Sequence, residues 1–202
     1  MTIVANVNME DNEVPMTQRP LVFLDIETTG GSPLSSRITE IGALRVEDGK
    51  VVAKFSQLVN PEQHVPSFIT KMTGISDDML WEAPLFRSIA TDLELFLNDA
   101  VFIAHNVNFD YSFIKTAFEQ MGSKFNMDRM CTARLSRKLY PDQPRHNLDT
   151  IIARHGFVVE DRHRAFDDAK VLYEFYQKAI AEHGLEAYRA MEHLLVKSRQ
   201  FG

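Results

Sequence analysis

Two carboxylates spaced two residues apart, Asp25 and Glu27, stand at the end of the apolar run Leu21-Val-Phe-Leu-Asp-Ile26. Side chains two apart on a β-strand point to the same face, so this spacing predicts that the two acids converge. Buried carboxylates repel each other and lose their hydration unless a positive charge lies between them. Mg²⁺ is a natural partner because it takes oxygen ligands and keeps positions for water and phosphate. Alone, however, the pair is equally compatible with two exposed acids at a strand end.

Two later segments favour the metal interpretation. In Ala104-His-Asn-Val-Asn-Phe-Asp110, the aspartate follows a short apolar run and opens a predicted helix. In His163-Arg-Ala-Phe-Asp-Asp168, the histidine and the last aspartate are five positions apart, or about 140° out of register on a helix. They cannot both face one site from a single helix. We therefore expect Asp168 in the first turn of a helix, where carboxylates are favoured, and His163 on the preceding loop.

These motifs resemble those of the DEDD exonucleases. Asp25-Ile-Glu-Thr-Thr-Gly30, followed by Ile38-Thr-Glu-Ile-Gly-Ala43, is similar to their first motif, and the Asp110 segment to their second. His163 to Ala169 fits the H-x-A-x-x-D-A pattern of the DEDDh branch, whereas Arg164 stands where the sister branch has tyrosine. The Thr73-Gly-Ile75 turn, with Ala83-Pro-Leu-Phe86 after it, also resembles the proofreading subunits of bacterial DNA polymerase III.

The resemblance implies a metal-dependent 3′–5′ exonuclease that releases nucleoside monophosphates. It implies that two Mg²⁺ or Mn²⁺ ions are held by four carboxylates, those of Asp25, Glu27, Asp110 and Asp168. Such ions lie roughly 3.5–4 Å apart and stabilise the attacking and leaving oxygens of an in-line displacement. His163 is then the general base, which must be neutral to accept a proton from the attacking water. Its ordinary pKa near 6.5 predicts a rate that falls below about pH 6.5.

Substrate contacts also follow from the resemblance. Thr28 and Thr29 match the family residues that seat the terminal nucleotide, while His105, Asn106 and Phe109 match those along the phosphate and sugar path. Stacking of bases on an aromatic side chain tolerates any sequence, which suits removal of any terminal residue. Phe109 is at least equally compatible with packing in the core, and His105 with a buried histidine satisfied by backbone partners.

The secondary-structure elements that must position these residues alternate in the order typical of an α/β fold. Strands are predicted at residues 21–26, 37–46, 51–59 and 100–104, with a Gly-containing turn that makes the second and third a hairpin. Helices are predicted at residues 85–97, 109–121, 131–139, 148–155, 165–182 and 185–197. The order, with the resemblance, predicts a ribonuclease H-like three-layer domain: a mixed sheet of about five strands with helices on both faces. We expect the last helix to pack on this domain.

Composition and charge exclude several classes of protein. The chain has 202 residues, and its net charge of −6 argues against a protein that coats nucleic acid, though not against one that acts on a strand end. Cys131 is the only cysteine, so an internal disulfide is excluded and a cytoplasmic location fits. No apolar segment reaches the roughly 20 residues that span a bilayer. We expect a loosely ordered tail over residues 1–19 and one exonuclease domain over residues 20–202.

The predicted substrate is a single-stranded or frayed 3′ end of DNA in proofreading or repair, and the predicted partner is a DNA polymerase or another replication or repair subunit. An exoribonuclease of the same fold is the close alternative, since the sequence does not tell how the pocket treats a 2′-hydroxyl. A scaffold that retains the fold without catalysis is a third hypothesis, but such a protein should have lost an acidic ligand, and none is missing here.

Overall fold

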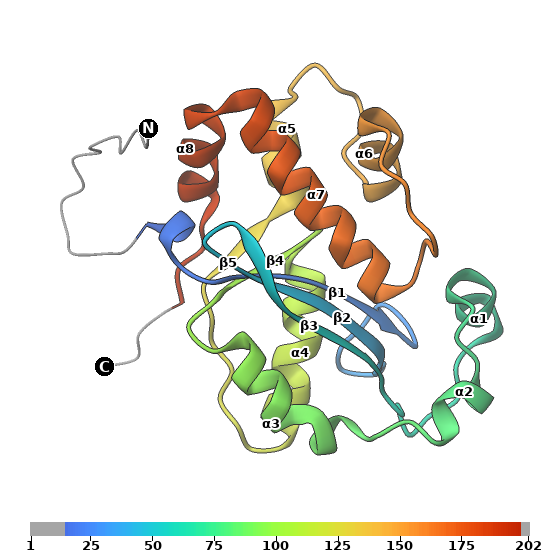
Figure 1. Ribbon diagram of the computed structural model, residues 1–202. Helices are drawn as coiled ribbons and strands as arrows, with labels where there is room; N and C mark the ends of the chain where they lie inside the picture. The colour runs from blue at the N-terminus through green and yellow to red at the C-terminus, as the bar shows by residue number, and fades with distance from the viewer. Residues whose placement is uncertain (1–14, 199–202) are drawn as a thin grey trace.

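A five-stranded mixed sheet forms the middle of the protein in the computed structural model, which describes residues 15–198 (Figure 1). The strand order is β3-β2-β1-β4-β5, so β1 is central. β2 runs antiparallel to both β1 and β3, whereas β4 runs parallel to both β1 and β5. The strands are β1 (Leu21–Thr28), β2 (Ile38–Glu47), β3 (Lys50–Leu58), β4 (Val101–Ala104) and β5 (Arg129–Cys131).

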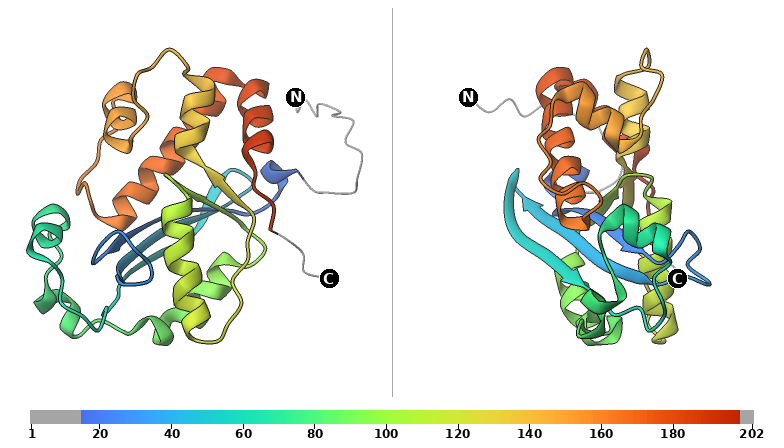
Figure 2. Two further views of the ribbon diagram at one scale, coloured as in Figure 1. Left: turned by 180° about the vertical axis from the view of Figure 1, so that it is seen from behind. Right: turned by 90° about the vertical axis from the view of Figure 1, so that its right-hand side faces the viewer.

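Helices cover both faces of this sheet, as the turned view in Figure 2 shows. Alternate residues of β1 enter different cores: Val22 and Leu24 lie in one core with α3 (Phe86–Leu97) and α4 (Asn108–Gln120). Leu21 and Phe23 lie in the other with α5 (Thr132–Leu139), α7 (Ala165–His183) and α8 (Leu185–Leu194). Burial on both faces explains why β1 is apolar almost throughout, as predicted for a central strand.

Three smaller helices complete the described part. α6 (Leu148–His155) has the predicted bounds, and its N-cap is Asn147, whose side chain accepts a hydrogen bond from the Thr150 backbone N–H. α1 (Ser67–Thr73) and α2 (Asp77–Trp81) stand at one edge of the molecule in Figure 1, around a small cluster of buried apolar residues: Val65, Ile69, Ile75 and Leu80. In residues 15–198, no helix combines the length and apolar character needed to cross a membrane.

The predicted elements agree with the structure except at a few places. β5, α1 and α2 were not predicted, and the last helix ends at Leu194 rather than Lys197 because Val196 pairs with Arg129 of β5 instead. Packing of α8 against the domain is confirmed by its buried Ala187, Ala190 and Met191. Of the expected tail, residues 1–14 lie outside the described residues, and Met16–Gln18 form a 3₁₀ helix with Met16 fully buried.

Candidate active site

Asp25 and Glu27 lie near the carboxyl end of β1, on the strand face that is turned toward α7. Their register partners on β2 are Gly42 and Glu40. Glu27 is 9% exposed. The predicted convergence of the two side chains therefore follows from the period of the strand, and it occurs at the edge where the parallel strands β1 and β4 both end.

Asp110 reaches this edge from the other side of the sheet. It lies in the first turn of α4, which begins four residues after β4 ends, and its side chain is buried. Its carboxylate accepts hydrogen bonds from its own backbone N–H and from that of Ile26 on β1. The second motif is thus held against the first by the backbone of the central strand.

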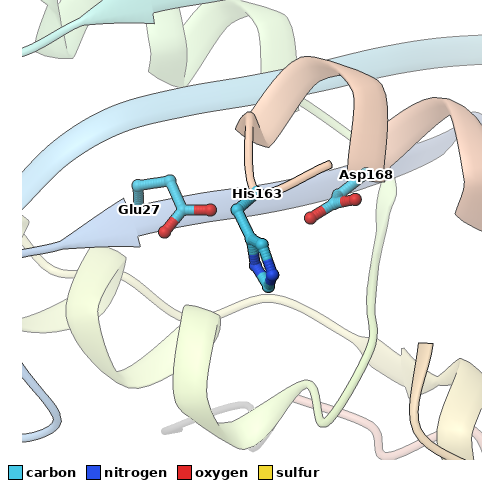
Figure 3. Close-up of side chains that lie close together, drawn as sticks. All are labelled: Glu27, His163 and Asp168. Atoms are coloured by element: carbon cyan, nitrogen blue, oxygen red, sulfur yellow. The ribbon is translucent and has the colours of Figure 1, made fainter. Parts of the chain in front are cut away.

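Asp168 and His163 take the two positions that their spacing requires. Asp168 lies in the first turn of α7, and His163 lies on the preceding loop with a left-handed φ of 66°. Figure 3 shows the carboxyl groups of Glu27 and Asp168 on either side of the His163 side chain, and each of the three residues offers a ligand atom within 4.8 Å of the others. Asp25 and Asp110 lie outside this tight group but line the same pocket.

A buried ion pair anchors the start of α7 on β2. Arg164 donates from Nε and Nη2 to the Glu40 carboxylate at distances of 2.7–3.1 Å. The same carboxylate accepts the Ala165 backbone N–H at 2.9 Å, and Glu40 is only 2% exposed. Gly42 allows the helix to approach, because a Cβ there would lie within 3.0 Å of the backbone of Ala165 and Phe166. Glu40 and Gly42 belong to the first motif, but the motif gave no indication of this contact.

Burial raises the pKa values of all four acids, and repulsion by nearby carboxylates adds to the shift for Asp25, Glu27 and Asp168. Burial raises the pKa of Glu27 to about 8, and the charge of Asp168 adds to this. Burial also raises the pKa of Asp110 to about 8 against its two backbone hydrogen bonds. The pKa of Asp25 rises well above its ordinary value through burial and the nearby Asp110 carboxylate. For Asp168, burial raises the pKa to about 6, although the positive charge of Arg162 opposes the shift.

The donor set fits a divalent cation. Carboxylates whose charged forms are this unfavourable need a positive partner, and hard cations take oxygen ligands. Asp168 Oδ1 is buried and has no hydrogen-bond partner within the described chain, so a ligand oxygen faces the pocket unsatisfied. Divalent cations held by Asp25, Glu27, Asp110 and Asp168 would satisfy both conditions.

Two residues that the sequence reasoning missed, Arg162 and Asp149, also line this pocket of about 250 Å³. Arg162 Nε donates to Asp149 Oδ1 at 2.7 Å, and its Nη1 donates to Asp168 Oδ2. Burial and the positive charge of Arg162 both lower the pKa of His163. The neighbours of His163 in the sequence could have drawn attention to Arg162, but no spacing rule connects it with Asp149.

The predicted substrate residues fall into two groups. His105, Asn106 and Phe109 line the pocket. His105 Nδ1 lies 3.0 Å from Thr132 Oγ1, and burial lowers the pKa of His105 to about 4, so its ring is neutral. Phe109 is half-buried and packs against Phe113 with tilted rings, so it both contacts the core and borders the pocket.

Thr28 and Thr29 do not line the pocket, and their hydroxyl groups have partners in the protein. Thr28 Oγ1 donates to the Gly30 carbonyl at 2.8 Å. Thr29 Oγ1 accepts the Arg37 backbone N–H at 2.9 Å and a hydrogen bond from Gln63. Both side chains are buried, so they brace the turn after β1. A role for either in seating the terminal nucleotide stays a prediction.

Comparison with known proteins covers the segment that contains all three motifs. The model of the RNase_T family, described as Exonuclease, matches residues 22–176. DNA polymerase III PolC-type of Caldanaerobacter subterraneus subsp. tengcongensis is 40% identical over 159 residues, which are 79% of this chain and 11% of that protein. The Clostridium perfringens protein of the same name is 38% identical over 153 residues, 76% of this chain and 11% of that one. The chain thus spans a small part of these relatives.

Solved structures share the fold at lower identity. Exonuclease X in complex with 5′ overhanging duplex DNA has a TM-score of 0.70 at 22% identity, covering 86% of this chain and 98% of that one. The nuclease domain of 3′hExo, a DEDDh family member, bound to rAMP, has a TM-score of 0.71 at 15% identity, covering 94% of this chain and 100% of that one. These matches confirm the predicted ribonuclease H-like architecture.

Proposed function

Because the chain belongs to the Exonuclease family and, by its motifs, to the 3′–5′ exonucleases of the DEDDh type, we propose that it shortens DNA from the 3′ end and releases nucleoside monophosphates. One observation carries the proposal: four carboxylates from three separate elements converge on a single pocket beside His163. Such a cluster is tolerable inside a protein when cations share it.

Divalent cations, Mg²⁺ or Mn²⁺, are the proposed cofactors. Asp25, Glu27, Asp110 and Asp168 would hold two of them, and the unpartnered Asp168 Oδ1 supports this assignment. When bound, the cations supply the charge that activates the attacking water and stabilises the departing 3′ oxygen. The four acids would determine where the cations bind, because three of the acids are buried and all four lie on β1, α4 or α7.

His163 is the proposed general base. Its lowered pKa keeps the imidazole neutral at neutral pH, as a proton acceptor must be. The His163 side chain lies between Glu27 and Asp168, and its ligand atom is within 4.8 Å of theirs, which places the ring beside the expected position of the attacking water (Figure 3). A position on a loop, outside the hydrogen-bonded frame of α7, allows the side chain to adjust when a strand end enters.

His105, Asn106 and Phe109 are proposed to receive the terminal nucleotide. They follow β4 on the side of the pocket opposite α7, so a strand end between them and His163 would bring its last phosphate to the carboxylates. The neutral ring of His105 can hydrogen-bond without adding charge. The exposed part of Phe109 provides an apolar surface for a sugar or base.

DNA is the proposed substrate, and replication or repair in the cytoplasm is the proposed setting. The support is the likeness to proteins named DNA polymerase III PolC-type at up to 40% identity. A polymerase or another replication subunit is accordingly the proposed partner. RNA is the alternative substrate, since a more distant structural neighbour is named for 3′-end recognition of a histone mRNA stem-loop at 15% identity.

The test compares 5′-labelled single-stranded DNA and RNA of one sequence, incubated with the purified chain and Mg²⁺ or Mn²⁺. We expect a ladder that shortens from the 3′ end, faster on DNA, and no ladder with EDTA or with the Asp25→Ala variant. A 3′-phosphorylated oligonucleotide is the matched control for the end that is attacked. Faster RNA degradation would reject the DNA assignment, and full activity of Asp25→Ala would reject the active site.

A further inference from the structure

Arg162 places a guanidinium group inside the acidic pocket. Its Nη1 donates to Asp168 Oδ2 and also lies 3.4 Å from His163 Nδ1. Its Nε donates to Asp149 Oδ1 at 2.7 Å. The two acids differ in burial, since the Asp168 side chain is 3% exposed and that of Asp149 is 62% exposed. Arg162 therefore joins a buried candidate ligand to an exposed acid at the rim.

The charge of Arg162 opposes the repulsion within the carboxylate cluster. It lowers the pKa of Asp25, Glu27 and Asp168, while burial raises all three. Among the pocket-lining residues of the described chain, Arg162 is the only lysine or arginine. A permanent positive charge at this position stabilises the buried acids as long as no metal ion is bound.

A divalent cation and this guanidinium compete for the same carboxylate, since Arg162 holds Oδ2 of Asp168 and the unpartnered Oδ1 is the oxygen left for a cation. Arg162 holds Oδ2 of Asp168 and lies against the His163 ring, so its group stands between two of the three side chains whose ligand atoms converge. Cations in the pocket would repel the guanidinium. The exposed Asp149 carboxylate, already paired with Nε, can keep hold of Arg162 after its contact with Asp168 is lost.

We propose that Arg162 is an internal counter-ion that divalent cations displace from Asp168, and that Asp149 retains the guanidinium once it is displaced. This inference rests on the cation site of the proposed function. It makes Arg162 a positioning residue that sets how readily the pocket loads, and Asp149 the residue that makes loading reversible.

The direct test is calorimetric titration of the full chain with MnCl₂ in the absence of nucleic acid. Arg162→Gln should bind Mn²⁺ more tightly, by roughly tenfold, since coupled groups of one network commonly interact at that level. Arg162→Lys keeps the charge and should stay closer to the wild type. Affinity of Arg162→Gln equal to or weaker than wild type would overturn the proposal, because an arginine that merely orients Asp168 aids binding.

A substitution at Asp149 provides a second, independent test of the proposal. Asp149→Asn should weaken Mn²⁺ binding severalfold in the wild-type background and much less in the Arg162→Gln background, as a double-mutant cycle would reveal. Equal weakening in both backgrounds would overturn the retaining role. Arg137→Gln is the matched control: this exposed arginine on α5 influences the pKa of His105 but forms no ion pair with the four acids in residues 15–198.

Thermal denaturation separates this inference from the proposed function. In EDTA, Arg162→Gln should unfold at a lower temperature than wild type, and Mn²⁺ should raise its melting temperature by more than it raises that of wild type. An unchanged or higher melting temperature in EDTA would overturn the counter-ion role. If wild type itself shows no Mn²⁺ binding, the cation site fails and the inference falls with it; if wild type binds normally and the variants do not differ, only the inference fails.

Discussion

The ion pair between Glu40 and Arg164 should set both the stability of the domain and the geometry of the pocket. We consider Glu40→Gln, which preserves the shape of the side chain and removes its charge. Glu40 is 2% exposed, and its carboxylate accepts three contacts from Arg164 and one from the Ala165 backbone. The amide retains one acceptor oxygen, but its NH₂ group must face the donors of Arg164 or of Ala165.

The expected loss of stability follows from burial. Removing one partner of a buried ion pair costs about 3–5 kcal/mol. The Arg164 side chain is 35% exposed, so water compensates part of the loss, and about 2 kcal/mol is the better figure. For a domain of this size that corresponds to a fall in melting temperature of roughly 4–8 °C.

The effect on activity should exceed what this stability loss implies. Asp168 lies three residues after Ala165, so a shift in the first turn of α7 moves a candidate ligand directly. A displacement of about 1 Å at a reacting centre can reduce the rate about 10²-fold. We expect a comparable fall in kcat for Glu40→Gln and for Gly42→Ala, whose new Cβ would force the backbone at Phe166 away from β2.

Arg45→Gln is the matched control for these measurements. Arg45 lies on the same strand, pairs with Glu47 at 2.7 Å and donates to the Phe96 carbonyl, but its partner on β1 is Val22, three positions before Asp25, and none of these bonds is to α7. The assay is the rate on single-stranded DNA at a temperature where every variant is folded by circular dichroism. If Glu40→Gln is destabilised like Arg45→Gln yet keeps the wild-type kcat, the ion pair supports the fold alone and the reasoning is refuted.

Three further outcomes are expected. Because Glu27 and Asp110 have pKa values of about 8 in the fold and about 4 when unfolded, cation-free protein binds more protons folded than unfolded over that range. Its melting temperature in EDTA should fall as pH rises from about 5 to 8, and Asp110→Asn should reduce that fall; a rising curve would contradict the shifts. With Mn²⁺ saturating, the pH at which the rate is half its maximum should lie below 6.5, since burial lowers the pKa of His163. His163→Gln should reduce kcat by about 10²–10⁴-fold and leave the affinity for Mn²⁺ little changed. Phe109→Ala should raise KM for single-stranded DNA roughly tenfold at similar kcat in steady-state kinetics, whereas an unchanged KM would leave Phe109 as a core residue only.

Elements whose signals are local could be predicted from the sequence. The apolar pattern identified β1 and the hairpin, and Leu148–His155 was predicted with its observed bounds because its apolar period is local and Gly156 marks its end. β5 has three residues and forms by pairing with β4 and Val196, which are distant in the sequence. A local sequence pattern therefore could not predict it. α1 and α2 are too short for a period and depend on their own small apolar cluster.

Some residues of the candidate site could likewise be predicted from local motifs, whereas others could not. Asp25, Glu27, Asp110, His163 and Asp168 were found through motifs, and the five-residue spacing correctly separated the loop histidine from the helical aspartate. Glu40 and Arg164 are 124 positions apart, and their contact follows from how α7 crosses β2, which the sequence does not reveal. Arg162 and Asp149 were missed because neither belongs to the motif pattern, although both line the pocket.

Two ion pairs at the start of α7, Glu40–Arg164 and Arg162–Asp168, have different roles in forming the pocket. Glu40 and Arg164 hold the helix on β2, which brings Asp168 close to Asp25 and Glu27 at a cost in repulsion. Arg162, two residues before Arg164, reduces that repulsion. The first ion pair thus brings the carboxylates together, and the second makes their proximity tolerable. A site built only from the four acids would oppose the packing of α7 on the sheet once they ionised without a cation, because nothing else in the pocket carries a fixed positive charge among the described residues.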